Sequence, residues 1–139
     1  MFELFITMIE KPLVTVITVC YNAVSLIEKT IRSVLAQQYE HIEYVVVDGG
    51  STDGTIEIIR KYEAHISHWI TEQDEGIYDA MNKGVAMATG EWCIFLNAGD
   101  TFAADDVLNR VFQVPREADV IYGDVVKNGI VKPAEAPHN

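Results

Sequence analysis

Basic residues are scarce in this sequence. Its 139 residues include 10 Lys and Arg against 21 Asp and Glu, so the formal net charge is −11 at pH 7. A chain this acidic would repel the phosphates of a nucleic acid, which argues against a nucleic-acid partner. It would also repel a small phosphorylated ligand unless a cation lay between that ligand and the protein.

The fingerprints of several common enzyme classes are absent. The chain contains no G-x-G-x-x-G dinucleotide-binding motif and no G-x-S-x-G nucleophile motif. Its four histidines are not spaced like metal ligands. Cysteine is rare as well: Cys20 and Cys93 both lie in apolar runs, so we expect two buried, reduced thiols and no disulfide.

No apolar run is long enough to cross a bilayer. The N-terminal MFELFITMI, residues 1–9, is apolar but lacks the basic start and the cleavage site of a signal peptide. We expect it to form a helical extension packed on the core. Peripheral contact with the inner face of a membrane, or a homodimer contact, are the alternatives, and the expected location is cytoplasmic.

Strand and helix patterns alternate along the chain. Hydrophobic residues make up 49% of it, and its length suits one domain, 1–139, with a core over about 12–125. β-branched runs of strand length are followed by segments with apolar residues at helical spacing. The expected strands are 14–22, 42–48, 67–72, 91–97 and 118–125, and the expected helices are 25–38, 55–65, 76–88 and 105–113.

This alternation predicts an α/β fold with a mostly parallel sheet flanked by helices. Right-handed crossovers bring the carboxyl ends of the strands to one edge, where open α/β sheets bind ligands. For the helix starts, Ser25 and Glu28 form a capping-box pattern, and Asp53 or Thr55 is the expected N-cap of the second helix.

The segment YVVVDGGSTDGT, residues 44–55, runs from an apolar strand into an acid and two glycines. A carboxylate accepts hydrogen bonds, so Asp48 suits the N–H of a nucleobase or the hydroxyls of a ribose. Gly49 and Gly50 allow a planar ring to approach the backbone. The alternative is that Asp48 caps the turn, and spacing alone gives the two interpretations equal weight.

Two further segments fall at the same edge. In FLNAGD, residues 95–100, acidic oxygens at a strand end suit Mg²⁺ or Mn²⁺, with a plain turn as the alternative. Such an ion would also connect an acidic protein to an anionic diphosphate. In EQDEGIYDAMNKG, residues 72–84, Lys83 either meets a phosphate or pairs with Asp79, four positions earlier.

Taken together, these segments resemble family 2 glycosyltransferases. VTVITVCYNAVSLIEKTIRSVLAQQYEHIEYVVVDGGSTDGT, residues 14–55, resembles the opening of that family, and DEGIYDAMNKGVAMATGEWCIFLNAGD, residues 74–100, resembles its bacterial exopolysaccharide, colanic-acid-type subgroup. The resemblance covers about residues 12–125. It implies a Rossmann-like GT-A fold, a nucleotide-diphosphate-sugar donor and a divalent cation, Mg²⁺ or Mn²⁺.

The resemblance also assigns site residues. It places Val19 and Tyr21 in the nucleotide pocket and Asp48 on the base, while Lys83 and a turn at Gly84 would shape the donor pocket.

The chain departs from the family pattern at two places. Asn97 and Gly99 occupy the positions of the D-x-D carboxylates, so Asp100 is the expected metal ligand. Gly49 replaces the second acid of the family's usual "DDGS".

The remaining departure concerns length. Family members are about twice as long, so we expect this chain to be a donor-binding half without the acceptor half and its general base; Asp124 is expected to be a strand-end residue. The expected function is inverting transfer of a sugar, from a UDP-sugar by preference, to a saccharide or lipid-linked acceptor in polysaccharide synthesis. The alternatives are a non-catalytic nucleotide-binding module and a structural fragment.

Overall fold

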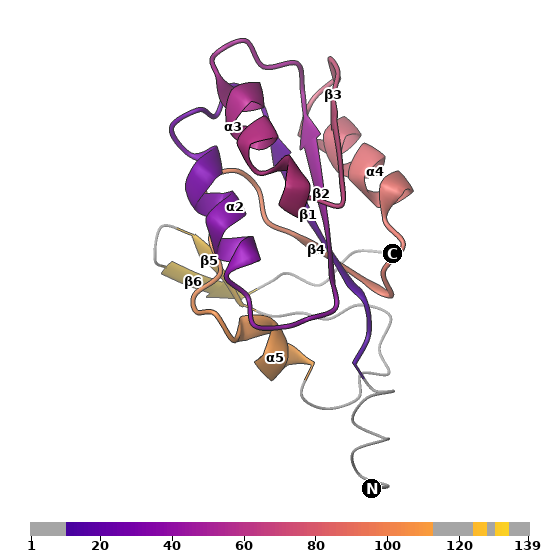
Figure 1. Cartoon of the computed structure of the whole chain (residues 1–139), viewed down its shortest axis with the longest axis vertical. Helices are drawn as coiled ribbons and strands as arrows, with labels where there is room; N and C mark the ends of the chain where they lie inside the picture. The colour runs from indigo at the N-terminus through magenta and orange to yellow at the C-terminus, as the bar shows by residue number, and fades with distance from the viewer. Residues whose placement is uncertain (1–10, 113–123, 128–129, 134–139) are drawn as a thin grey trace, which may run out of the picture.

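The computed structural model describes residues 11–112, 124–127 and 130–133, and its main body is a sheet with helices on both faces (Figure 1). The four strands lie in the order β3-β2-β1-β4, and every pair is parallel. The expected α/β fold is therefore confirmed. The strands are β1 Val14–Cys20, β2 Ile42–Asp48, β3 His68–Thr71 and β4 Trp92–Phe95.

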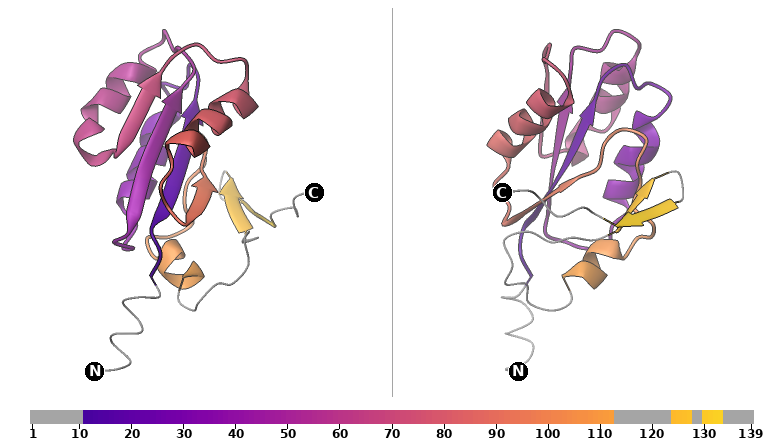
Figure 2. Two further views of the ribbon diagram at one scale, coloured as in Figure 1. Left: turned by 90° about the vertical axis from the view of Figure 1, so that its right-hand side faces the viewer. Right: turned by 180° about the vertical axis from the view of Figure 1, so that it is seen from behind.

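Helices cover the two faces of the sheet unequally. Helices α2 (Ile27–Leu35) and α3 (Thr55–Lys61) lie on one face, and α4 (Ile77–Met87) lies on the other (Figure 2). A short 3₁₀ helix, Glu63–His65, follows α3, and α5 (Val107–Val111) follows β4. Because both faces are covered, all seven residues of β1 are buried, which explains its almost continuous apolar sequence.

Each face of the sheet has its own core. On the side of α2 and α3, Ile27, Ile31 and Ile59 are fully buried against the sheet. On the side of α4, Ile17 and Val45 pack in a smaller cluster with Ala80 and partly buried Met81 and Met87. The alternation of side chains along β1 and β2 supplies both clusters from the same strands.

The helix starts differ from the prediction. Helix α2 begins at Ile27, and its N-cap residue, Leu26, makes no side-chain capping bond, so the capping box of Ser25 and Glu28 does not form. The Glu28 carboxylate instead accepts hydrogen bonds from Lys61 Nζ at 2.9 Å and Tyr62 Oη at 2.6 Å, which join α2 to the end of α3. At α3 the N-cap residue is Gly54, although Asp53 accepts a hydrogen bond from the amide of Thr55 at 3.1 Å.

The last expected strand is also different. Strand β5 (Asp124–Lys127) pairs antiparallel with β6 (Ile130–Pro133) in a separate two-stranded sheet, so residues 124–125 do not extend the parallel sheet as predicted. The two strands flank the sequence Asn128-Gly129, which is a strong hairpin signal. The rest of the predicted strand, 118–123, lies outside the described residues.

The two cysteines differ in their exposure to solvent. Cys20 is buried as expected, but Cys93 is exposed, and both are free thiols. Cys93 lies on β4, an edge strand of the described sheet, where no further strand of that sheet covers it. The N-terminal segment 1–9 lies outside the described residues. Within the described part of the chain, no helix is long and apolar enough to cross a membrane.

Candidate functional site

The loops that follow β1, β2 and β3 meet at one end of the sheet, the upper end in Figure 1. The strand register places Cys20, Asp48 and Thr71 side by side at the carboxyl ends of these strands. The segment after β4 joins them, because the amide of Ala98 donates a hydrogen bond to the carbonyl of Val19 at 3.2 Å. We call this end of the sheet the ligand edge, since open α/β sheets bind ligands there.

Asp48 is fully buried at this edge, and its carboxylate is bound entirely by protein groups. Oδ2 accepts hydrogen bonds from the amides of Gly50 (3.0 Å) and Ser51 (2.8 Å) and from the hydroxyl of Thr71 (2.8 Å). Oδ1 accepts from the hydroxyl of Ser51 (2.5 Å) and from Cys20 Sγ (3.4 Å). This is the turn-capping arrangement, and direct contact of Asp48 with a base stays a prediction.

The protonation states follow from these contacts. Burial alone would raise the pKa of Asp48, but the hydrogen bonds from Ser51 and Thr71 outweigh it and hold the pKa below its ordinary value. Burial and the neighbouring Asp48 charge raise the pKa of the Cys20 thiol far above its ordinary value. At neutral pH the ligand edge therefore holds a carboxylate next to a neutral thiol, so Cys20 is not a nucleophile.

The polar residues after Asp48 hold the neighbouring loop. Four side-chain-to-backbone hydrogen bonds join residues 21–24, after β1, to residues 51–55, after β2, and we call them the polar latch. They run from Asn22 N to Ser51 Oγ (2.7 Å), from Thr52 N to Asn22 Oδ1 (2.9 Å), from Ala23 N to Thr55 Oγ1 (2.9 Å) and from Val24 N to Asp53 Oδ2 (3.1 Å). The acid, glycines and small polar residues of 48–55 thus build the ligand edge itself.

Tyr21 directly precedes the residues that the polar latch holds. Asn22 has a φ of 46°, in the left-handed region that Asn tolerates better than most residues. Tyr21, just before it, is 63% exposed at the ligand edge, so its ring is available to a ligand. Val19 is only 5% exposed and packs in the core on the side of α4, so it has a packing role here, and its contact with a nucleotide stays a prediction.

The segment 97–100 forms a tight turn. The amide of Asp100 donates to the carbonyl of Asn97 at 2.9 Å, and Gly99 between them has a φ of +100°, which favours glycine. Asn97 Oδ1 is buried and accepts no hydrogen bond from any described residue. Sequence reasoning did not select Asn97, because the side chain looked like a lost carboxylate, whereas a buried oxygen without a partner among the described residues is open to a water or an ion.

Asp100 supplies the second oxygen-bearing side chain of this turn. It is partly buried, and the hydrogen bonds that it makes to other described residues involve its backbone: the amide donates to the Asn97 carbonyl, and the carbonyl accepts from the Thr30 hydroxyl. Among the described residues no three His, Cys, Asp or Glu side chains cluster as a metal site. An amide oxygen and a carboxylate fit a hard cation that takes its other oxygens from a diphosphate and water.

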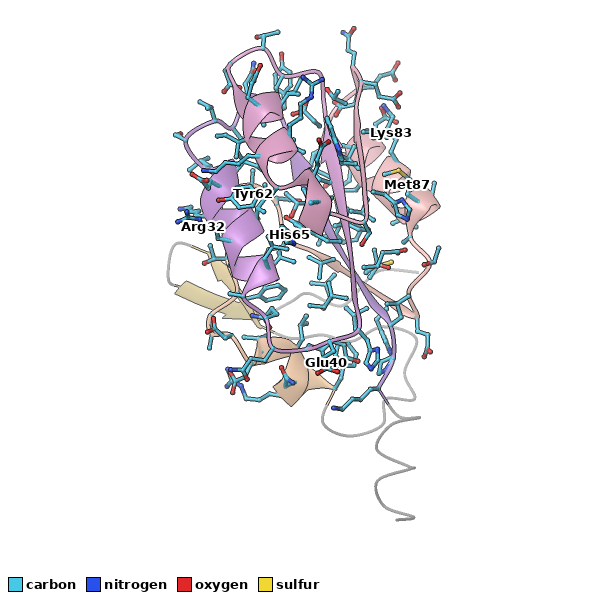
Figure 3. The ribbon with its side chains drawn as sticks, viewed as in Figure 1. Arg32, Glu40, Tyr62, His65, Lys83 and Met87 are labelled. Carbon is cyan, nitrogen blue, oxygen red and sulfur yellow. The ribbon has the colours of Figure 1, made fainter. Side chains whose placement is uncertain are left out.

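Lys83 lies on α4 on the side toward the ligand edge, above Met87 in Figure 3. Its Nζ is 3.1 Å from Glu72 Oε1 and 3.4 Å from Asp79 Oδ2, and it donates to the carbonyl of Gln73 at 3.3 Å. These contacts agree with the pairing interpretation of Lys83. The lysine braces the loop after β3 against α4, and contact with a phosphate stays a prediction.

Gly84 does not lie in a turn, as the resemblance implied, because α4 continues through it to Met87. A Cβ at this position would lie 2.5 Å from Ile17 Cγ2, so glycine is needed for close packing of α4 on β1. At Gly49 a Cβ would lie 2.5 Å from Asp74 Oδ2, so the Asp74 side chain would have to move to admit one. An acid at position 49 would therefore meet the Asp74 carboxylate.

Comparison with protein families decides the identity. The family model described as "Glycosyl transferase family 2" matches residues 15–139. The chain belongs to glycosyl transferase family 2. Two relatives of this family 2 chain are an uncharacterized glycosyltransferase of Mycobacterium tuberculosis, 40% identical over 107 residues, and a putative teichuronic acid biosynthesis glycosyltransferase of Bacillus subtilis, 41% identical over 100 residues.

Solved structures place this family 2 chain in the GT-A fold. A mannosyltransferase of Pyrobaculum calidifontis, in complex with GDP-Man and Mn²⁺, matches with a TM-score of 0.68 at 33% identity, over 73% of this chain and 32% of that one. S. aureus TarS (residues 1–349) in complex with UDP-GlcNAc matches with a TM-score of 0.66 at 26% identity, over 70% of this chain and 29% of that one. The GT-A expectation is confirmed.

The relatives extend well beyond the part of their sequence that aligns with this chain. The alignments cover 76% of this chain but 41% of the Mycobacterium tuberculosis relative, and 68% of this chain but 39% of the Bacillus subtilis relative. The aligned part of the family 2 chain thus spans about two fifths of the length of these proteins.

Proposed function

We propose that this family 2 chain binds a nucleotide-diphosphate-sugar at the ligand edge and serves sugar transfer to a saccharide or lipid-linked acceptor in glycan synthesis. The observation that carries the proposal is the juxtaposition of an exposed aromatic ring, Tyr21, with a turn in which Asn97 Oδ1 has no hydrogen-bond partner among the described residues. The hydrogen bond between Ala98 and Val19 holds that turn beside the end of β1. An aromatic ring suits a base, and unpaired oxygens suit a cation that accompanies a diphosphate.

Asn97 Oδ1 and the Asp100 carboxylate would hold a divalent cation, Mg²⁺ or Mn²⁺. When bound, that ion supplies charge neutralisation for the diphosphate. The Pyrobaculum mannosyltransferase in complex with GDP-Man and Mn²⁺ supports this choice. Asn97 and Asp100 orient the diphosphate end of the donor, and Tyr21 orients the base.

In the proposed transfer, an acceptor hydroxyl attacks the anomeric carbon while the bond to the diphosphate breaks, with inversion at that carbon. The hydroxyl proton passes to a general base, which we assign to none of the described residues. The donor is a UDP-sugar or a GDP-sugar, since relatives in complex with UDP-GlcNAc and with GDP-Man match about equally well. A lipid-linked acceptor would be consistent with synthesis at the inner face of a membrane.

Calorimetric titration of the 139-residue chain with UDP and with GDP, each with and without Mn²⁺, tests the proposal. We expect one nucleotide to bind with Mn²⁺ and to bind far more weakly without it. Tyr21→Ala should weaken binding by about 1–3 kcal/mol, the value of a base–aromatic stack. Leu35→Ala is the control, because Leu35 is a 37% exposed apolar residue at the last position of α2, the end of that helix away from the ligand edge. No binding of either nucleotide would contradict the proposal and leave a structural role.

A further inference from the structure

Helix α2 and the residues just after it hold the long segment that follows β4. Thr30 and Ser33 lie three positions apart, which places them on one side of the helix, and Gln37 follows two residues after its end. Figure 1 shows the segment after β4 running beside α2. An apolar face would be enough to pack a helix, so these polar groups indicate that a particular path of the segment is being fixed.

Thr30 contacts the turn of residues 97–100. Its hydroxyl donates a hydrogen bond to the carbonyl of Asp100 at 2.8 Å and accepts one from the amide of Gly99 at 2.9 Å. Thr30 is fully buried, so water cannot replace these bonds at low cost. Both backbone groups belong to the stretch that directs the Asp100 side chain.

The other two side chains hold later parts of the segment. Ser33 Oγ accepts from the amide of Phe102 at 3.2 Å. The Gln37 side chain donates to the carbonyl of Ala104 at 2.6 Å and accepts from the amide of Leu108 at 3.1 Å. Gln37 thus makes the same number of bonds to the segment as Thr30, but beyond the turn that holds Asn97 and Asp100.

We propose that Thr30 is a positioning residue for the donor site: its buried hydroxyl sets the backbone of Gly99 and Asp100, and so the direction of the Asp100 carboxylate. This inference rests on the function proposed above. Gly99 has a left-handed φ and no side chain, so its backbone is free to change unless an outside group fixes it. The hydroxyl of Thr30 supplies that fixation from a rigid helix, without touching the ligand.

The test measures the affinity of the 139-residue chain for Mn²⁺ in the presence of the nucleotide that binds, by calorimetry. Thr30→Val keeps the shape of the side chain and removes both hydrogen bonds. It should weaken Mn²⁺ binding about tenfold, as loss of an outer supporting contact does at metal sites. Thr30→Ser keeps the hydroxyl and should bind within about twofold of the wild type. Gln37→Leu is the matched control, and it too should stay within about twofold.

Every outcome of this test either supports or overturns the inference about Thr30. Unchanged Mn²⁺ affinity in Thr30→Val, or an equal loss in Gln37→Leu, would overturn the inference, since the contact would then be structural only. No nucleotide binding by the wild type would instead overturn the proposed function, and this inference with it. If Thr30→Val does not fold, Thr30→Cys takes its place, because a thiol is only a weak hydrogen-bond donor. This variant should lose at least about threefold in Mn²⁺ affinity, which is more than the twofold range of the Gln37→Leu control, and a smaller loss would overturn the inference.

Discussion

The side-chain oxygen of Asn22 accepts a hydrogen bond from the amide of Thr52 at 2.9 Å, and this contact crosses from the loop after β1 to the loop after β2. It is one of the four bonds of the polar latch at the ligand edge. Asn22 meets two needs there, because its side chain accepts the bond while its backbone occupies the left-handed region. The loop that carries Tyr21 is therefore held by the loop that carries Asp48.

Asn22→Ala is expected to lower the free energy of unfolding by about 2 kcal/mol, since it removes the hydrogen bond and places at positive φ a residue that tolerates this region less well than asparagine. Asn22→Gly removes the bond but tolerates the backbone, so it should cost about 1 kcal/mol. Urea denaturation at pH 7 measures both. Equal losses for the two variants would show that backbone conformation has no part in the effect.

Asp48→Asn should destabilise the protein by about 3 kcal/mol at pH 7, because an amide cannot accept all the hydrogen bonds that the buried carboxylate accepts. The effect should depend on pH. The folded protein holds the pKa of Asp48 below its ordinary value, so the stabilisation is present above the unfolded value, about 4, and is lost as the pH falls through the lower folded value.

Urea denaturation of wild type and Asp48→Asn from pH 7 down to pH 3 measures this dependence. The difference in unfolding free energy between them should shrink below about pH 4. Glu43→Gln is a suitable comparison, because Glu43 lies at the opposite end of β2 and its pKa is also held low. Burial would raise that pKa, but the hydrogen bonds from Thr89 and Thr15 outweigh it. A difference for Asp48→Asn that does not change with pH would contradict the assignment.

Gly84→Ala should destabilise the protein by about 1–2 kcal/mol, even though alanine favours helices more than glycine does. The reason is the Cβ, which would lie 2.5 Å from the buried Cγ2 of Ile17 and push α4 away from β1. Val85→Ala, at a 47% exposed position on the same helix, is the control and should change stability by less than about 1 kcal/mol. A Gly84→Ala protein as stable as the wild type would show that α4 shifts freely.

The parallel sheet could be predicted from the sequence because β1 and β2 are uninterrupted β-branched runs whose burial on both faces leaves a clear signature. Features that depend on residues far apart in the sequence could not be predicted from it. Cys93 lies in an apolar run, yet it is exposed because β4 is an edge of the described sheet. The Glu28 carboxylate fits a capping box by spacing, but Lys61 and Tyr62 draw it to α3.

The site was predicted in outline for the same reason. Topology alone brings Tyr21, Asp48 and Asp100 to one edge, so their neighbourhood could be predicted. Spacing does not tell whether a carboxylate points inward, and the partners of Asp48 include Thr71, which is far along the chain. Asn97 Oδ1, which has no hydrogen-bond partner within the described part of the chain, likewise stands out only when its surroundings are known.

The most direct test of the central claim is an electron paramagnetic resonance titration of Mn²⁺, which reports free and bound ion separately, with and without UDP or GDP. The account predicts that the wild type binds Mn²⁺ with nucleotide and that Asn97→Leu and Asp100→Asn each weaken this binding by at least about tenfold. Asp106→Asn, which removes an acid paired with Arg110 outside the turn, should have no such effect. Equal Mn²⁺ binding by all four proteins would contradict the claim that the turn of residues 97–100 forms the donor site.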